Sequence, residues 1–333
     1  MQKVSSAAPG SLFCVSQAPV GIFDSGVGGL SVLREIQAAL PAEAIYYVAD
    51  SANAPWGDKP REFVRERGLK IAEFLVGEGV KAIVIGSNTG TAGAAEALRG
   101  ALSVPVVGIE PGIKPAVAAT RTGVVGAIVP AAVSESDRLA SLLDRFGTDV
   151  KVIIQPVPGL VEHIEAADLD GTELRRMVEA YVRPMLDAGA DTIVLGSTHY
   201  VFLKPVLAEL AGPNVALIET GAAVARQLAR VLDERDLRAD GERSAERFWT
   251  SGDTTTSTRV ISALLGRAVH VERLPNSQRW RTACVIWRAL HGPAGSGVRR
   301  RSRWLRPYSR SSRWQRQEMR CTPAAGARAE AFP

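Results

Sequence analysis

Two serines end closely similar segments of the chain and are its first candidates for chemistry. Ser87 ends the segment LVGEGVKAIVIGS at 75–87, and Ser197 ends the segment MLDAGADTIVLGS at 185–197. A serine hydroxyl holds a ligand through hydrogen bonds, and it acts as a base or a nucleophile where another group takes its proton. The side chains beside each serine therefore decide what chemistry it supports.

Polar side chains that can assist the serines follow them directly or end another apolar run. They are Asn88, Thr89, Thr198, His199, Asp24 and Ser25. A histidine or a carboxylate can serve as a general acid or base. Structural alternatives exist: Ser87 can cap a helix, Asp24 can accept backbone hydrogen bonds at its turn, and His199 can be a packed side chain.

The two serine segments form an internal repeat. Five identities fall in register, among them Gly79 with Gly189 at the expected helix end and Gly86 with Gly196 before the serine. Each copy predicts a helix end, an apolar strand and a turn at the carboxyl end of that strand, where α/β proteins bind ligands. The repeat favours two similar halves that each offer one hydroxyl to a shared cleft, over a chance likeness of two βα units.

Short apolar runs alternate with helical patterns, which is typical of an α/β protein with a mostly parallel sheet. The patterns predict strands at 20–23, 45–48, 82–85, 104–109, 124–129, 150–155, 192–195 and 215–218, and helices at 30–40, 61–78 and 92–98. We expect two pseudosymmetric α/β domains, one formed by 19–112 plus 214–274 and the other by 113–213. Residues 1–18 are expected to be a disordered leader.

The charge is distributed unevenly along the chain. The net charge is +5, but residues 275–333 contain 13 Arg, no Lys and two acids, so this tail carries +11 (13 minus 2) and the remainder −6 (5 minus 11). Four of the six Trp also lie in the tail. Arginines mixed with aromatic residues can bind a nucleic acid. We favour two alternatives together, a solvated disordered extension and aberrant sequence from a shifted reading frame.

Other features exclude several classes of protein. Cys14, Cys284 and Cys321 show neither disulfide nor metal spacing, and no apolar run is long enough to span a bilayer. We therefore expect a cytoplasmic protein without a metal site. The stretch Gly26-Val27-Gly28-Gly29 suggests a phosphate loop, but it lacks the dinucleotide spacing and a Lys, so this indication is weak.

Several motifs in a fixed order carry a resemblance to a known family. They are VGIFDSGVGGLSVLREI, VADSANAPWGDKP, IGSNTGTAGAAEALR, VPVVGIEPGIKPAV and LGSTHYVFLKPVL. From about Pro19 to about Val271 the chain resembles the glutamate racemases of the aspartate/glutamate racemase superfamily. The resemblance implies two pseudosymmetric α/β domains with the site in the interdomain cleft. It also implies glutamate as substrate, no cofactor, a role in supplying D-glutamate for peptidoglycan, and a homodimer as one open oligomeric state.

Carried over residue by residue, the resemblance implies a site. The catalytic set is Ser87, Ser197, Asp24, His199 and Glu165, with the serines at the positions of the family's two catalytic cysteines. Asp24 would assist the first of these positions and His199 the second, while Glu165 resembles the acidic residue near the second. The substrate-binding set is Ser25, Pro55, Trp56, Gly57, Asn88, Thr89 and Thr198.

The departures from the family pattern bear on activity. Trp56 replaces a Tyr, Ala132 stands where a Thr is expected, Gly90 replaces an Ala and Val201 a Pro. A thiol has a pKa of about 8.5, whereas a hydroxyl is far less acidic and is a poor base without help. The hypotheses are an impaired racemase, an inactive paralogue that binds an acidic amino acid, and interaction through the tail. The missing thiols favour the inactive paralogue. An altered chemistry that uses the serines is a further alternative. An engineered Cys→Ser variant that traps substrate is disfavoured, because the other departures from the family pattern would also change its pocket.

Overall fold

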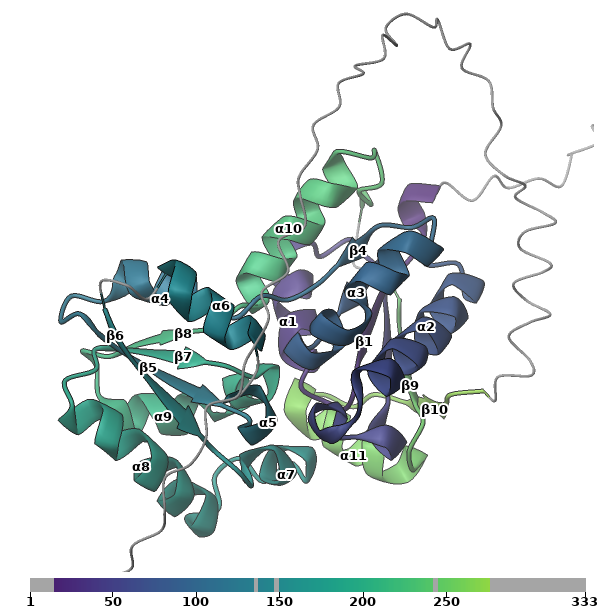
Figure 1. The fold of residues 1–333 in the computed structure, drawn as a ribbon. Coiled ribbons are helices and arrows are strands. Elements are labelled where there is room, and N and C mark those ends of the chain that lie inside the picture. The colour runs from purple at the N-terminus through teal and green to yellow at the C-terminus, as the bar shows by residue number, and fades with distance from the viewer. Residues whose placement is uncertain (1–14, 135–136, 147–149, 242–244, 276–333) are drawn as a thin grey trace, which may run out of the picture. The chain divides into compact units, whose positions relative to one another are not determined.

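The computed structural model describes residues 15–134, 137–146, 150–241 and 245–275 (Figure 1). Their strands form two sheets, with the orders β10-β9-β2-β1-β3-β4 and β6-β5-β7-β8, and every pairing is parallel. The prediction of an α/β fold with two mostly parallel sheets is therefore confirmed.

The strands follow the apolar runs closely. The first sheet contains β1 (Val20–Asp24), β2 (Ile45–Ala49), β3 (Ala82–Ile85), β4 (Val106–Val107), β9 (Glu246–Thr250) and β10 (Val271–Arg273). The second contains β5 (Val124–Val129), β6 (Lys151–Pro156), β7 (Thr192–Leu195) and β8 (Ala216–Ile218). Every residue of β1, β3 and β7 is buried, because helices cover both faces of each sheet.

Helices form the outer layers of both sheets (Figure 1). The first sheet has α2 (Arg61–Gly77) and α3 (Asn88–Ala101) on one face, and α1 (Leu30–Ala39), α10 (Gly221–Asp233) and α11 (Thr254–Leu265) on the other. The second has α4 (Ile113–Ala119) and α6 (Asp137–Phe146) on one face, and α8 (Thr172–Asp187) and α9 (Lys204–Ala211) on the other. Two short helices, α5 (Ala131–Ser134) and α7 (Leu160–Glu165), follow strands β5 and β6.

The internal repeat corresponds to equivalent structure in the two sheets. Gly79 after α2 and Gly189 after α8 have φ values of 86° and 88°, the left-handed conformation that favours glycine at a helix end. The Gly86 N–H donates to Phe23 O (2.7 Å), and the Gly196 N–H donates to Ile128 O (2.8 Å). Both serines thus leave the sheet at the same point of the same local structure.

Strand pairing corrects the predicted domain ranges at one place. The prediction assigned 214–274 to the first domain, but β8 pairs with β7, with Ile218 beside Val194, so 216–218 belong to the second sheet. The Ala216 N–H donates to Asp191 O at 2.8 Å, which fixes the start of this pairing. The other boundaries of the two domains stay predictions.

The prediction of a disordered leader over 1–18 is wrong for residues 15–17. Val15–Gln17 form the 3-10 helix η1, because Ser16 O accepts from the Lys81 ammonium and Gln17 Nε2 donates to Asp240 O (3.1 Å). The rest of the leader, residues 1–14, and the basic tail from residue 276 onward lie outside the described residues. Within the described part of the chain, no helix is both long and apolar enough to cross a membrane.

Candidate active site

Asp24 forms the centre of the first half-site at the carboxyl end of β1. Its carboxylate is buried and accepts from the Ser25 N–H (2.6 Å) and the Gly29 N–H (2.7 Å). Burial raises the pKa of Asp24 above its ordinary value, and the charge of His199 and hydrogen bonds from Ser87, Ser25 and Gly29 only partly offset this rise. A carboxyl whose pKa moves toward neutral is suited to exchange a proton.

Ser87 caps α3 and faces Asp24 at the same time. Its backbone is extended (φ −145°, ψ 154°) and its Oγ accepts from the Gly90 N–H at 3.2 Å. The helix-cap alternative is therefore correct in geometry. It does not exclude the site, because the Ser87 side chain is partly exposed and its hydrogen bond lowers the pKa of Asp24.

The second half-site contains a chain of three side chains. Ser197 caps the 3-10 helix η4 (Thr198–Leu203), and its Oγ lies 3.4 Å from both the backbone N and the ring Nδ1 of His199. His199 Nε2 lies 2.7 Å from Oε1 of Glu165, at the end of α7. Since a carboxylate accepts, Nε2 carries the proton and Nδ1 presents its lone pair toward Ser197 whenever the ring is neutral.

The histidine and the carboxylate shift each other's pKa. Burial alone lowers the pKa of His199, but the hydrogen bond and charge of Glu165, with the charges of Asp24 and Glu162, raise it above its ordinary value. Burial raises the pKa of Glu165, but His199 and the Val27 N–H outweigh it, and the net shift is downward. The pair is therefore charged over a wide range around neutral pH.

Three hydrogen bonds join elements of the first sheet to elements of the second. The Val27 N–H donates to Glu165 Oε1 (2.9 Å), and Asn88 Nδ2 donates to Gly196 O (3.0 Å). Ser31 Oγ donates to the backbone oxygen of Thr198 (2.9 Å). They connect the residues that follow β1 and β3 with those that follow β6 and β7. The serine half-sites are therefore neighbours, although 110 positions separate Ser87 from Ser197 (197 minus 87).

The glycine stretch after β1 makes this meeting sterically feasible. A Cβ on Gly26 would lie 2.0 Å from Glu165 Oε1, and one on Gly28 would lie 2.3 Å from His199 Nδ1. A Cβ on Gly29 would lie 3.0 Å from both Asp24 Cβ and the Tyr47 hydroxyl. Glycine is therefore required at these positions because side chains of both half-sites lie against the backbone. The phosphate-loop hypothesis is not needed to explain them.

Trp56 lies against the start of α3 and away from solvent. Its buried indole donates from Nε1 to Asp50 Oδ2 (3.1 Å), and its ring lies 3.4 Å from where a Cβ on Gly90 would be. An Ala at 90 would also approach Ser87 Oγ at 2.8 Å. The tight contacts of such a Cβ would be with Ser87 Oγ and Ile85 Cγ2 (2.9 Å), whereas its contact with the Trp56 ring would be an ordinary one.

The remaining predicted residues contribute less to the network. Ser25 Oγ lies 3.4 Å from Asp24 Oδ1, while Thr89 is half-buried at the start of α3. Pro55 precedes the 3-10 helix η3 (Trp56–Asp58), which contains Gly57, and Ala132 lies in α5. The sequence prediction missed Tyr47, whose buried hydroxyl donates to Gly26 O at 2.8 Å, and its position inside a strand gave no signal.

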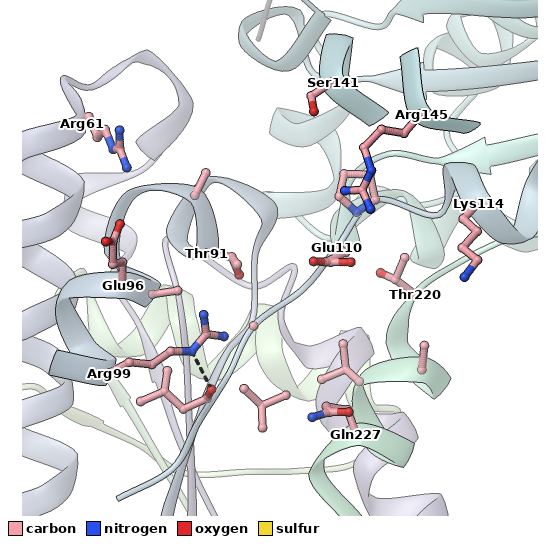
Figure 2. Close-up of a pocket in the computed structure, with 18 residues that line it drawn as sticks. Arg61, Thr91, Glu96, Arg99, Glu110, Lys114, Ser141, Arg145, Thr220 and Gln227 are labelled. Carbon is pink, nitrogen blue, oxygen red and sulfur yellow. Dashed lines mark hydrogen bonds between the residues drawn. The ribbon is translucent and has the colours of Figure 1, made fainter. Parts of the chain in front are cut away.

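A separate pocket of about 900 Å³ is lined in part by α3, the helix that Ser87 caps (Figure 2). Residues of α3, α4, α6 and α10 line it, and neither serine does. Four basic side chains surround it with two carboxylates: Arg61, Arg99, Lys114, Arg145, Glu96 and Glu110. This set of charges suits an anionic ligand that also offers hydrogen-bond donors.

Comparisons with known proteins agree with the geometry. The family model described as Asp/Glu/Hydantoin racemase matches residues 20–228. The glutamate racemase of Pseudomonas paraeruginosa is 53% identical over 258 residues, which are 77% of this chain and 97% of that relative. The glutamate racemase of Pseudomonas aeruginosa is 52% identical over 261 residues, or 78% and 98% of the two chains.

Solved structures give the same result for the fold. The crystal structure of glutamate racemase isoform RacE1 from Bacillus anthracis matches with a TM-score of 0.71 and 30% identity, over 79% of this chain and 99% of that chain. The structure of Escherichia coli glutamate racemase with L-glutamate and the activator UDP-MurNAc-ala matches with a TM-score of 0.69 and 29% identity, over 77% and 98%. The chain belongs to the aspartate/glutamate racemase family.

Proposed function

We propose that this chain binds glutamate between the Ser87 and Ser197 half-sites and moves its Cα proton far more slowly than a relative with two thiols. The observation that carries the proposal is the hydrogen bond from Asn88 Nδ2 to Gly196 O. It joins the residue after one serine to the residue before the other. A Cα between them would have one hydroxyl on each face, which is the arrangement that inversion at carbon requires.

An unpaired acceptor supports binding of an amino acid. Among the described residues, the buried Oδ1 of Asn88 has no hydrogen-bond partner. A buried acceptor left without a donor costs about 1–3 kcal/mol, and an α-ammonium group would supply that donor. The Francisella tularensis and Escherichia coli relatives, described as complexes with D-glutamate and L-glutamate, indicate which amino acid to test.

The serines limit the chemistry of the proposed reaction. Racemisation removes a proton from one face of Cα and returns one to the other, so each half-site must act once as base and once as acid. By the resemblance, Ser87 and Ser197 replace two thiols, and a hydroxyl can take part only by passing its proton to Asp24 or His199. One positioned acid-base group contributes about 10²–10⁴-fold, so losing both thiols predicts a very slow reaction.

The first test is glutamate binding by titration calorimetry. We expect the native chain to bind glutamate and the Asn88→Ala variant to bind at least about 10-fold more weakly, since about 1.4 kcal/mol corresponds to that factor. Asn214→Ala is the matched control, because Asn214 is exposed in the loop between α9 and β8. Absence of binding by the native chain, or equal affinity of Asn88→Ala, would overturn the proposal.

The same proposal gives the chain a cellular setting and a second ligand. We propose D-glutamate supply for peptidoglycan in the cytoplasm as the setting that the family resemblance implies, and the homodimer stays a prediction. The Escherichia coli relative is described with an activator, UDP-MurNAc-ala. The basic pocket of Figure 2 supports binding of such a phosphate-bearing ligand here. We expect it to raise the melting temperature of the native chain and to do so less for Arg99→Ala; no shift would contradict this part.

Interaction through the basic tail is the competing function. The tail from residue 276 lies outside the described residues. This hypothesis predicts DNA binding that weakens with salt and disappears on deletion of 275–333. Binding that survives the deletion would exclude the tail.

A further inference from the structure

Ser197, His199 and Glu165 form a hydroxyl–imidazole–carboxylate chain. Ser197 Oγ lies 3.4 Å from His199 Nδ1, and His199 Nε2 lies 2.7 Å from Glu165 Oε1. Ser197 and Glu165 are partly exposed, while His199 between them is buried. A nucleophile, a base within reach of it and a carboxylate that orients the base are the three parts of the serine hydrolase triad.

We propose that Ser197 is an activated nucleophile that accepts an acyl group from small uncharged esters, a capacity separate from glutamate binding. A hydroxyl gains nucleophilicity beside an imidazole that has lost its proton, and for His199 this requires a pH above its raised pKa. Uncharged esters are the substrate class because they need no ionic partner to bring their carbonyl carbon to the partly exposed Ser197 Oγ.

The reaction has two balanced steps. In the first, Ser197 Oγ bonds to the ester carbonyl carbon, its proton passes to His199 Nδ1, and the carbon–alkoxide bond breaks as that proton goes to the departing alcohol. In the second, water bonds to the acyl carbon with His199 taking its proton, and the Ser197 oxygen leaves and regains a proton. Ester and water become acid and alcohol, and the protein is unchanged.

Several contacts hold the chain of three groups in place before any ligand arrives. The Val27 N–H donates to the same Glu165 oxygen at 2.9 Å, which fixes the carboxylate. The His199 backbone N–H donates to Ser197 Oγ (3.4 Å), which leaves the hydroxyl proton free to be donated to Nδ1 when the ring is neutral. Gly28 leaves the space that the imidazole occupies. The 3.4 Å separation of Ser197 Oγ from His199 Nδ1 is longer than an ordinary hydrogen bond between such groups.

Ser87 offers an internal comparison. Its Oγ accepts from the Gly90 N–H at 3.2 Å and interacts with Asp24, a carboxylate. The two serines share the same extended backbone and the same place after a strand. A higher reactivity of Ser197 than of Ser87 would therefore be due to the His199 imidazole, which only Ser197 has as a neighbour.

The test uses diisopropyl fluorophosphate on the full native chain, followed by mass spectrometry of peptides. Ser197 Oγ would bond to phosphorus as fluoride leaves and the proton passes to His199. We expect Ser197 to be modified at least about 10-fold faster than Ser87, and modification to fall at least about 10-fold in His199→Asn and Glu165→Gln. Circular dichroism and urea denaturation of each variant separate a lost fold from a lost nucleophile.

The pH dependence gives a second readout. The groups that face His199 are Glu165, Asp24 and Glu162, and together they keep its pKa above the ordinary value. Modification of Ser197 should therefore rise with pH through that raised pKa and shift to lower pH in Glu165→Gln. Equal modification of Ser87 and Ser197, no modification at all, or rates unchanged by His199→Asn would each overturn the proposal. A chain that binds glutamate but is not modified would refute this inference and leave the proposed function intact.

Discussion

The substitution Gly28→Ala tests the claim that the glycine stretch exists to admit the second half-site. A Cβ at this position would lie 2.3 Å from His199 Nδ1, 2.5 Å from Cε1 and 2.8 Å from Thr198 Oγ1. Non-bonded contacts are optimal near about 3.5 Å, so the imidazole must move by about 1 Å. A shift of this size away from Glu165 takes the 2.7 Å contact between His199 Nε2 and Glu165 Oε1 to roughly 3.7 Å, which is no longer a hydrogen bond.

Two quantities should change. Overpacking costs about 1–3 kcal/mol of unfolding free energy, measured by urea denaturation. The pKa of His199, followed by NMR and assigned with His199→Asn, should fall because the imidazole loses the partner that raises it. Gly100→Ala is the control, since a Cβ there meets nothing within 4 Å inside α3 and an Ala should stabilise the helix by about 0.5–1 kcal/mol. A Gly28→Ala chain with native stability and an unchanged His199 titration would refute the steric argument.

Three further substitutions test separate parts of the structure. Glu165→Gln should lower the pKa of His199 and cost about 1.5–3 kcal/mol of unfolding free energy. Because the folded pKa of His199 is raised and that of Glu165 is lowered, this loss should be largest between about pH 4.3 and 6.5, and it should shrink as His199 deprotonates above that range and as Glu165 is protonated below it. A pH-independent difference in urea denaturation would contradict this prediction. Trp56→Phe should cost about 1.5–3 kcal/mol because the buried indole N–H leaves Asp50, and a native denaturation midpoint would show that this hydrogen bond contributes nothing. Lys81→Met should cost about 3–5 kcal/mol in urea denaturation because Glu43 would lose its buried ion pair, whereas a neutral result would place water beside that carboxylate.

The sequence predicted most of the fold because apolar runs mark buried parallel strands. The runs at 82–85, 124–129 and 192–195 match β3, β5 and β7 residue for residue. The final short run was located correctly but assigned to the wrong domain. Its apolar pattern shows that β8 is a strand, but only pairing with β7 shows which sheet it joins.

The site was less accessible to sequence reasoning. The repeat and the motifs indicated both serines and His199, but local pattern cannot show that Glu165, 34 positions before His199, reaches its ring. The purpose of the Gly26–Gly29 stretch was likewise hidden, since the atoms that exclude a Cβ come from the other half of the chain. Tyr47 looked like any aromatic strand residue, although its hydroxyl holds the loop at Gly26.

The most direct measurement is Cα deuterium uptake by L- and D-glutamate in heavy water, with the native chain beside the Ser87→Cys, Ser197→Cys double variant. We predict that the native chain binds glutamate yet exchanges its Cα hydrogen at least about 100-fold more slowly than the double variant, whose thiols restore acid-base groups near neutral pH. A native chain that exchanges as fast as the double variant would contradict it, because Asp24 and His199 would then activate the serines fully.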